Sequence, residues 1–266
     1  MINIRASMLP SACDCMKRAI AGQFRNDIKK AGFILKEREP IIGGAVGTAV
    51  HDGSEYTIKQ LLLTGSHASK NDCIEVGMKT FKEEIKDGTI WDSTTTSGNE
   101  AEKQISNMVN SFYLQIAPSV QPASMPEKKY ELQIGNDIIF TGSSDIEEIN
   151  NDLHDIKTGV MLRSYQAQQG GYSILRQHAK GLIAGKLIID YLPRVSTRKA
   201  YPGATQKIYN RDTCEKLAFY TIIRIAEIMR QFYTDYNSDK IPCNPMSMLC
   251  SDKFCTAYGT KFCRLG

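Results

Sequence analysis

The stretch from Glu131 to Tyr172 constrains the fold of this chain more than any other part of the sequence. Three apolar-rich segments with alternating or buried-strand character are separated by turn residues at 135–137 and 150–152. A segment with helical character follows and carries several glutamines. With helical patterns on both sides of this stretch, the sequence predicts an α/β fold in which a central mixed β-sheet is flanked by helices.

Three charged residues in this stretch are expected to converge on one face of the sheet. Residues two apart on a strand point to the same side, so Asp155 and Lys157 project together while Ile156 points into the core. If Asp145 lies on the adjacent strand of a hairpin, its carboxylate reaches the same face. Two carboxylates beside an ammonium group suit Mg²⁺ or Mn²⁺. An ordinary exposed Asp–Lys pair at a strand end is the commoner interpretation of such a pattern.

Four short motifs occur in order along the chain. They are Gly47-Thr48-x-x-His51, Gly142-x-x-Asp145, Asp155-x-Lys157-Thr158-Gly159 and Gln168-x-x-x-Tyr172. In this order they resemble the RecB-like branch of the PD-(D/E)xK nuclease superfamily. The resemblance extends from Cys15 to Cys263, and it implies a restriction-endonuclease-like core that hydrolyses DNA with the help of divalent metal ions.

The resemblance also implies a role for each residue of the metal site. His51 would enter as a neutral imidazole ligand. Together with Asp145, Asp155 and the main-chain carbonyl of Ile156, it would hold one or two Mg²⁺ or Mn²⁺ ions. Lys157 would position the attacking water or the scissile phosphate.

The helix after these strands would supply two further catalytic-site residues. Gln168 and Tyr172 are four residues apart and therefore share one helix face. The resemblance implies that this face lies near the catalytic pocket, where the pair holds DNA or orients the lysine. Gln166 and Gln169 are near alternatives, and Glu131 is a candidate for a supporting carboxylate on the preceding strand.

The cysteines suggest a second metal site. The N-terminal segment has no apolar run typical of a signal peptide, and no run approaches the roughly 18 apolar residues that span a bilayer. We therefore expect a soluble cytoplasmic protein, in the host cytoplasm if the chain is phage-encoded. The eight cysteines are then reduced thiols or metal ligands. Cys250, Cys255 and Cys263 lie in a loop-rich end that needs a tether to be ordered.

One N-terminal cysteine would complete a set of four thiolates, enough for a 4Fe–4S cluster or a tetrahedral Zn²⁺ ion. The tail resembles that of the iron–sulfur subset of RecB-like exonucleases, which includes CRISPR-associated and phage-encoded families. That resemblance implies Cys15 as the fourth ligand, so that the cluster staples the two chain ends together. Cys13 competes with Cys15, and Cys243 is available as a substitute ligand. Cys73 and Cys214 are expected to be buried thiols.

We expect a single nuclease domain over residues 1–266. Its helical N-terminal part would cover 1–126, its catalytic sheet core 127–200, and its C-terminal helix and cysteine tail 201–266. Hydrophobic patterns and cap residues predict helices at 11–31, 43–63, 68–88, 97–116, 164–178 and 211–234, and a strand at 185–191. The basic segment 194–201 suits phosphate contacts in a loop, although a solvated basic loop is the commoner outcome.

The function that these features favour is a metal-dependent DNA exonuclease acting in recombination or repair. The tail resembles a phage-encoded family, so a phage single-strand annealing protein is a candidate partner beside DNA. The net charge of +4 permits nucleic-acid binding without indicating it. The alternatives are a non-catalytic DNA-binding subunit that keeps the fold as a scaffold, and a structural module stapled by zinc.

Overall fold

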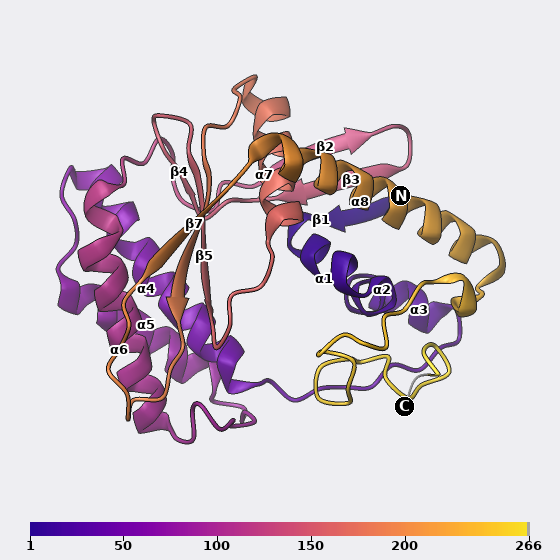
Figure 1. Cartoon of the computed structure of the whole chain (residues 1–266), viewed down its shortest axis with the longest axis horizontal. Helices are drawn as coiled ribbons and strands as arrows, with labels where there is room; N and C mark the ends of the chain where they lie inside the picture. The colour runs from indigo at the N-terminus through magenta and orange to yellow at the C-terminus, as the bar shows by residue number, and fades with distance from the viewer. Residues whose placement is uncertain (265–266) are drawn as a thin grey trace.

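The strands form two mixed sheets in residues 1–264, the part of the chain that the computed structural model describes (Figure 1). The first sheet has the order β1-β3-β2, with β1 at Ile2–Arg5, β3 at Ile138–Gly142 and β2 at Tyr130–Ile134. The second has the order β4-β5-β6-β7, at Ile146–Glu147, Leu153–Gly159, Leu187–Pro193 and Thr205–Tyr209. The predicted mixed α/β architecture is confirmed, but the prediction of one central sheet is wrong. The last two residues of the predicted domain lie outside the described part.

The chain passes from one sheet to the other between Gly142 and Ile146. β3 pairs with β2 as an antiparallel hairpin, and its other edge pairs in parallel with β1, a strand that the sequence analysis did not predict. Because both edges of β3 are occupied, the strand that follows cannot pair with β3, and it lies in the second sheet instead. The main-chain N–H of Asp145 donates to the carbonyl of His154 at 3.1 Å, which starts the pairing of β4 with β5.

The second sheet is built around a parallel pair. β5 and β6 run parallel and are joined by helix α7 at Gln166–Lys180. The strand predicted at 185–191 is therefore confirmed. β7 is antiparallel to β6 at the sheet edge, in a region where no strand was predicted.

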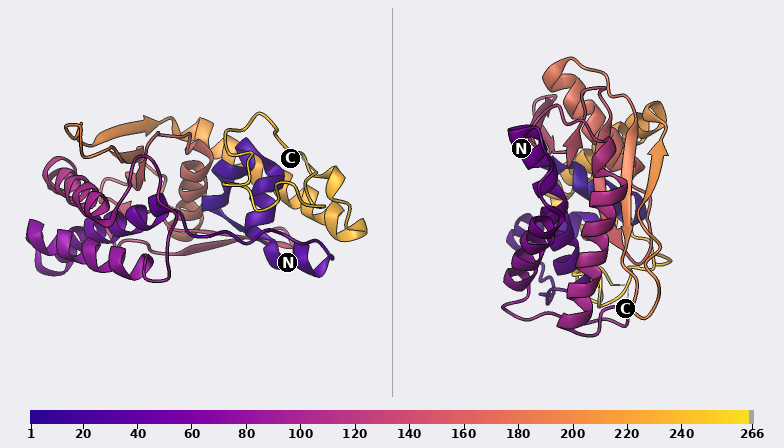
Figure 2. Two further views of the ribbon diagram at one scale, coloured as in Figure 1. Left: turned by 90° about the horizontal axis from the view of Figure 1, so that it is seen from below. Right: turned by 90° about the vertical axis from the view of Figure 1, so that its left-hand side faces the viewer.

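Three helices cover one face of the second sheet. They are α4 at Ile42–Thr64, α5 at Lys70–Glu84 and α6 at Gly98–Gln115, with the short 3-10 helix η2 at Ala117–Ser119 after them (Figures 1 and 2). Their apolar side chains form a buried cluster with Ile156 and Leu192 of the sheet. At Gly53 the backbones of α4 and α5 approach closely, because a Cβ there would lie 2.6 Å from the carbonyl of Cys73.

The other face packs against a second cluster that also includes the first sheet. Leu187 and Ile189 of β6 lie in this cluster with α7 and with α8 at Arg211–Asp235. The contact between α7 and α8 requires a glycine, since a Cβ at Gly170 would lie 2.0 Å from the carbonyl of Cys214. Cys73 and Cys214 are both fully buried, as predicted.

The N-terminal helical segment is broken into pieces. The 3-10 helix η1 at Ala6–Met8 leads into α1 at Leu9–Asp14, α2 at Met16–Gln23 and α3 at Arg25–Lys30. The prediction of one helix over 11–31 is wrong, because Cys15 has an extended backbone with φ −149°. This break brings the Cys15 sulfur to 3.4 Å from the main-chain N–H of Asn244 in the C-terminal tail.

The C-terminal tail packs against the N-terminal helices. After the 3-10 helix η3 at Ser238–Lys240, it runs without helix or strand beside α1–α3 (Figures 1 and 2). The Phe262 ring lies 5.3 Å from that of Phe33 and 6.0 Å from that of Phe232. The two ends of the chain are therefore in contact. Among the described residues no helix is long and apolar enough to cross a membrane.

Candidate active site

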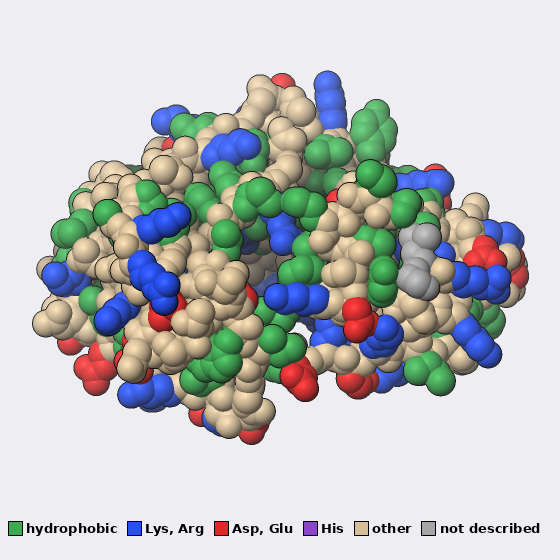
Figure 3. All heavy atoms as spheres, turned by 60° about the horizontal axis from the view of Figure 1, so that its bottom comes forward, with side chains coloured by type: hydrophobic (Ala, Val, Ile, Leu, Met, Phe, Trp, Pro, Cys, Tyr) green, Lys and Arg blue, Asp and Glu red, His purple; other side chains and the backbone are tan. Residues whose placement is uncertain are grey.

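A cavity of about 380 Å³ opens between α4 and the C-terminal end of β5. Figure 3 shows a recess between the two halves of the molecule, with Lys, Arg and hydrophobic side chains beside it. The close approach of helix and strand depends on Gly47, where a Cβ would lie 2.9 Å from the hydroxyl oxygen of Thr158. The cavity is lined by Gly47, Thr48, His51, Asp52, Glu127, Ile156, Lys157 and Thr158.

Asp155 and Lys157 project to the same side of β5, as predicted. The Lys157 Nζ lies 2.7 Å from Asp155 Oδ2, and Ile156 is buried in the helix-covered core on the other face. Burial raises the pKa of Asp155 to about 6, although the adjacent ammonium opposes this shift. Burial alone would lower the pKa of Lys157, but the negative charges of Asp155 and Asp145 raise it. The lysine therefore keeps its proton at neutral pH.

His51 and Asp145 meet at the mouth of the cavity. The His51 Nε2 lies 2.9 Å from Asp145 Oδ1, while Asp145 Oδ2 accepts a hydrogen bond from the main-chain N–H of Ile156 at 2.5 Å. Burial alone would lower the pKa of His51, but the charge of Asp145 outweighs it and raises the pKa to about 9. Despite its burial, Asp145 has a lowered pKa because it faces His51 and Lys157. A cation would therefore replace the His51 proton between these two groups.

Glu127 completes a group of three potential ligands that sequence analysis missed. The ligand atoms of His51, Glu127 and Asp145 all lie within 4.8 Å of one another. Glu127 has a left-handed backbone with φ 55°, and its main-chain N–H donates to the carbonyl of Asp145 at 3.3 Å. Glu131, the carboxylate named from the sequence, is exposed on β2 instead. Glu127 follows Pro126 in a turn, and no local pattern marks it.

Asp145 and Asp155, the two carboxylates of the predicted site, have different partners. Asp145 is held by His51, whereas Asp155 is held by Lys157 and is not among the described groups of three ligand atoms within 4.8 Å. A second such group consists of His51, Asp52 and Glu55 on α4. The donor set of imidazole and carboxylate groups suits Mg²⁺ or Mn²⁺.

Gln168 and Tyr172 lie behind Asp155 and not on the open surface. The Gln168 amide donates to the Tyr172 hydroxyl, which donates in turn to Asp155 Oδ1 at 3.5 Å. Both side chains are buried. The expected proximity of this helix face to Asp155 is therefore present. Of the near alternatives, Gln169 points to the carbonyl of Ile188 at 3.3 Å.

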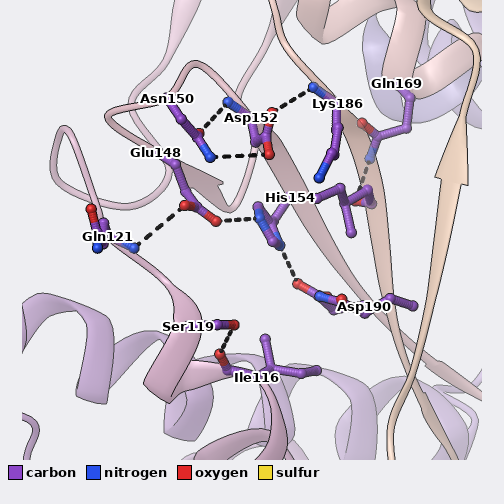
Figure 4. A network of polar contacts seen from close by, with 12 residues as sticks. Ile116, Ser119, Gln121, Glu148, Asn150, Asp152, His154, Gln169, Lys186 and Asp190 are labelled. Atoms are coloured by element: carbon purple, nitrogen blue, oxygen red, sulfur yellow. Dashed lines mark hydrogen bonds and ion pairs between the residues drawn. The ribbon is translucent and has the colours of Figure 1, made fainter.

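A buried charged network lies on the opposite side of β5 (Figure 4). The His154 Nδ1 lies 2.8 Å from Asp190 Oδ2, and its Nε2 lies 2.7 Å from Glu148 Oε1. The second oxygen of Asp190 accepts from Gln206 at 2.7 Å. Although burial alone would lower the pKa of His154, the hydrogen bonds and charges of its two carboxylate partners raise it to about 9. This network links the segment after β4 to β5, β6 and β7.

The basic segment 194–201 does not present its first arginine to solvent. Arg194 is buried, and its Nη1 and Nη2 bind the two carboxylate oxygens of Asp92 at 3.0 and 2.7 Å. The Arg194 Nη1 also donates to Thr95. A bidentate ion pair therefore takes the place of the phosphate contact considered for this residue, and no local pattern indicates that pair.

Five cysteines converge at the contact between the two chain ends. Cys15, Cys243, Cys250, Cys255 and Cys263 line one pocket. Burial raises the pKa of the Cys250 thiol, and the negative charge that the other four would carry as thiolates raises it further. The four predicted ligands therefore line one pocket, and Cys243, the substitute ligand, lines it as well.

Cys13 lies outside this pocket, exposed, with its sulfur 3.5 Å from the hydroxyl of Thr221. Of the two N-terminal candidates, the structure places Cys15 in the cysteine pocket. Within residues 1–264, no three cysteine sulfurs all lie within 4.8 Å of one another.

Cations border the cysteine pocket. Lys17 and Arg18 line it, and Lys17 is buried with its Nζ 5.9 Å from the centre of the Phe262 ring. In the described part of the chain, no carboxylate forms a salt bridge with Lys17. A buried ammonium needs a nearby negative charge. A metal group held by four thiolates carries net negative charge, so the residues present fit such a group.

Two solved structures are similar to this chain at low sequence identity. No family model and no curated protein matches the chain. A solved structure described as a putative exonuclease from Eubacterium rectale is similar at 10% identity and a TM-score of 0.49, covering 72% of this chain and 78% of that one. A second, of the protein SSO0001, is similar at 12% identity and a TM-score of 0.28, covering 75% and 82%. At these scores neither similarity assigns a function.

Proposed function

We propose that this protein is a divalent-metal-dependent deoxyribonuclease that hydrolyses phosphodiester bonds. The observation that carries the proposal is that His51 and Lys157 line one cavity and that each contacts a buried carboxylate behind it. His51 lies 2.9 Å from Asp145, and Lys157 lies 2.7 Å from Asp155. Ordinary surface ion pairs do not bury two carboxylates, an imidazole and an ammonium beside an open cavity.

In this proposal His51, Asp145 and Glu127 hold a Mg²⁺ or Mn²⁺ ion, with Asp155 and the carbonyl of Ile156 completing the site. When bound, the cation lowers the pKa of a water molecule and offsets phosphate charge. His51 must lose its proton to bind a metal. Asp145 is held in place by the main-chain N–H of Ile156. Tyr172 and Gln168 fix the orientation of Asp155 from behind.

Lys157 supplies the permanent positive charge of the proposed site. Its Nζ lies 2.7 Å from Asp155 Oδ2 and 5.1 Å from the centre of the Tyr165 ring, on the wall of the cavity. From there the ammonium can orient a water molecule or neutralise an oxygen of the scissile phosphate. Its raised pKa keeps it charged in the range where nucleases work.

The finer assignment is an exonuclease of the RecB-like type. The order of the four motifs supports it, and the cysteine tail supports an iron–sulfur, phage-encoded subfamily in DNA recombination or repair. A phage single-strand annealing protein would then be a partner. We also propose that the whole chain acts as one nuclease domain, in which the cysteine pocket holds the two chain ends together beside the catalytic sheet.

A time course on end-labelled linear DNA and on closed circular DNA tests the activity. With Mn²⁺ or Mg²⁺ present, we expect release of labelled nucleotides from linear DNA, no cutting of the circle, and no reaction with EDTA. Asp155→Ala should abolish release. Lys186→Ala serves as the control, because it removes an exposed lysine that lies near the His154 network of Figure 4 and does not line the cavity.

A protein that binds DNA ends but releases no nucleotide with either metal would favour the alternative of a non-catalytic scaffold subunit. Cutting of the closed circle would replace exonuclease by endonuclease while keeping the metal-dependent chemistry. Release that persists in Asp155→Ala would remove the proposed site altogether.

For the cysteine pocket we propose a 4Fe–4S cluster held by Cys15, Cys250, Cys255 and Cys263, with Zn²⁺ as the alternative. Elemental analysis for iron, sulfide and zinc, together with visible absorbance, separates the two. Cys15→Ser should reduce the metal content of the purified protein, and Cys13→Ser is the matched control. Equal losses in both variants would contradict the predicted ligand set.

A further inference from the structure

The chain that leaves the proposed site exposes two adjacent apolar side chains. Val160 is 60% exposed and Met161 is 53% exposed. They follow Thr158, which lines the cavity, and Gly159, whose φ of 148° favours glycine. The exposed pair therefore begins beside the cavity, and Val160 follows Lys157 after only Thr158 and Gly159.

The base of this segment is fixed on both sides. The carbonyl of Gly159 accepts from the Tyr191 hydroxyl at 2.7 Å and from the main-chain N–H of Arg194 at 2.8 Å. At the other end, Leu162 packs against the core, and the main-chain N–H of Tyr165 donates to the Tyr209 hydroxyl at 3.3 Å. Two apolar side chains thus stand on a rigid base and are not part of a loose loop.

A cation lies on each side of the pair in the sequence. Lys157, which is paired with Asp155, precedes it, and Arg163, which lies within electrostatic reach of Asp14, follows it. Arg163 is exposed, and in the described part of the chain no carboxylate forms a salt bridge with it. An apolar tip with a cation after it matches a nucleic-acid end, which offers base faces and phosphates.

We propose that Val160 and Met161 form a wedge that contacts the terminal base pair of duplex DNA and separates its strands, while Arg163 binds a phosphate of the diverted strand. The inference rests on the proposed nuclease function and deepens it by naming the substrate as a duplex end. An opened end lets one strand enter the cavity beside Asp155. Apolar side chains inserted between bases are a common means of unstacking DNA.

The test uses the full-length protein and the double variant Val160→Ser/Met161→Ser. Substrates are a blunt duplex and a duplex whose last base pairs are mismatched, so that its end is already open. For the wild type we expect similar rates on both. For the double variant we expect the blunt-end rate to fall about tenfold and the open end to restore most of it, because the variant lacks the apolar side chains that unstack the terminal pair and an open end needs no unstacking.

A second readout does not depend on hydrolysis. A duplex with 2-aminopurine in its terminal pair should gain fluorescence on binding to Asp155→Ala, which cannot cut, and gain much less when the two serine substitutions are added. Leu114→Ser, which changes a 60% exposed side chain on α6, is the control and should behave like the wild type. Arg163→Gln should weaken binding and lower the salt dependence by about one phosphate contact.

Equal rates of the double variant on blunt and open ends, at the wild-type level, would overturn the wedge. A change in oligomeric mass on substitution would also overturn it, and would assign the surface to a second copy of the chain. A fluorescence gain without any hydrolysis by the wild type would support the wedge and contradict the nuclease proposal, so the two failures are distinguishable.

Discussion

The two faces of β5 both carry charged side chains, and they use them differently. On one face Asp155 and Lys157 pair beside an open cavity; on the other, His154 is enclosed by Asp190 and Glu148. Both faces bury carboxylates with a cation. The enclosed network satisfies both imidazole nitrogens with carboxylate oxygens, whereas the open site gathers His51, Asp145 and Glu127 around a space that a cation can enter. Access to solvent, and not residue type, separates a candidate reactive site from a structural network.

The largest expected effect is on activity, at the open face. Lys157→Ala should lower the nuclease rate by about a thousandfold, because one preorganised charge at the reacting group is worth that much. Mn²⁺ affinity, measured by calorimetry, should change little, since the lysine is not a ligand. Lys186→Ala should leave the rate unchanged. A Lys157→Ala protein that cuts linear DNA at the wild-type rate would remove the lysine from the mechanism.

The next effect is on stability, at the enclosed face. Asp190→Ala leaves the His154 imidazole with one partner and a buried charge only half compensated. We expect the free energy of unfolding to fall by about 3–4 kcal/mol, measured by urea denaturation. Thr205→Ala, at an exposed position of the neighbouring β7, is a control that should cost much less. A loss below about 1 kcal/mol would show that the network is not structural.

The ion pair of Asp92 and Arg194 extends the comparison to a third site, in which the arginine is buried and the carboxylate is partly exposed. Although burial opposes it, the contacts with Arg194 lower the pKa of Asp92 below its usual 3.8. A carboxyl group with a depressed folded-state pKa stabilises the fold above its unfolded pKa and loses that contribution as the pH falls through the folded value. Asp92→Asn should therefore cost about 2 kcal/mol at pH 6 and much less near pH 2. Unfolding curves at the two pH values check this, and an equal cost at both would contradict it.

The smallest effect sharpens the description of the metal site. Glu127→Gln should weaken Mn²⁺ binding by about tenfold, because it removes one charged oxygen from the group around His51 and Asp145. Glu131→Gln is the matched control and should bind Mn²⁺ like the wild type, since Glu131 is exposed on β2. Calorimetric titration of both variants distinguishes them. Equal affinities would show that Glu127 is not a ligand.

Local patterns predicted much of the site. The two-residue period of a strand placed Asp155 and Lys157 on one side of β5 and Ile156 on the other, because side chains alternate on any strand. The four-residue spacing of Gln168 and Tyr172 likewise placed them in contact on one helix face. These relations depend only on backbone geometry, so they hold wherever the strand and the helix lie.

Relations between distant segments could not be predicted in this way. Its place on a predicted strand made Glu131 a candidate for a supporting carboxylate. Glu127 has no such local pattern, because its position depends on a left-handed turn near Asp145. One sheet was expected, because nothing in the first residues showed that β1 would occupy the free edge of β3. The pattern of segment 194–201 suggests phosphate contacts or a solvated loop, but Arg194 is buried against Asp92, which lies about a hundred residues earlier in the chain.

The sequence by itself determined the alternation of β5, the helix face of α7 and the presence of cysteines at both chain ends. Only the tertiary structure decided that β3 and β5 belong to different sheets, that Glu127 joins His51, and that Cys15 and not Cys13 faces the tail. The physical reason is the distance along the chain over which each effect acts. Periodicity acts between residues a few positions apart, whereas a metal site is assembled from segments whose distance is fixed only after the core has packed.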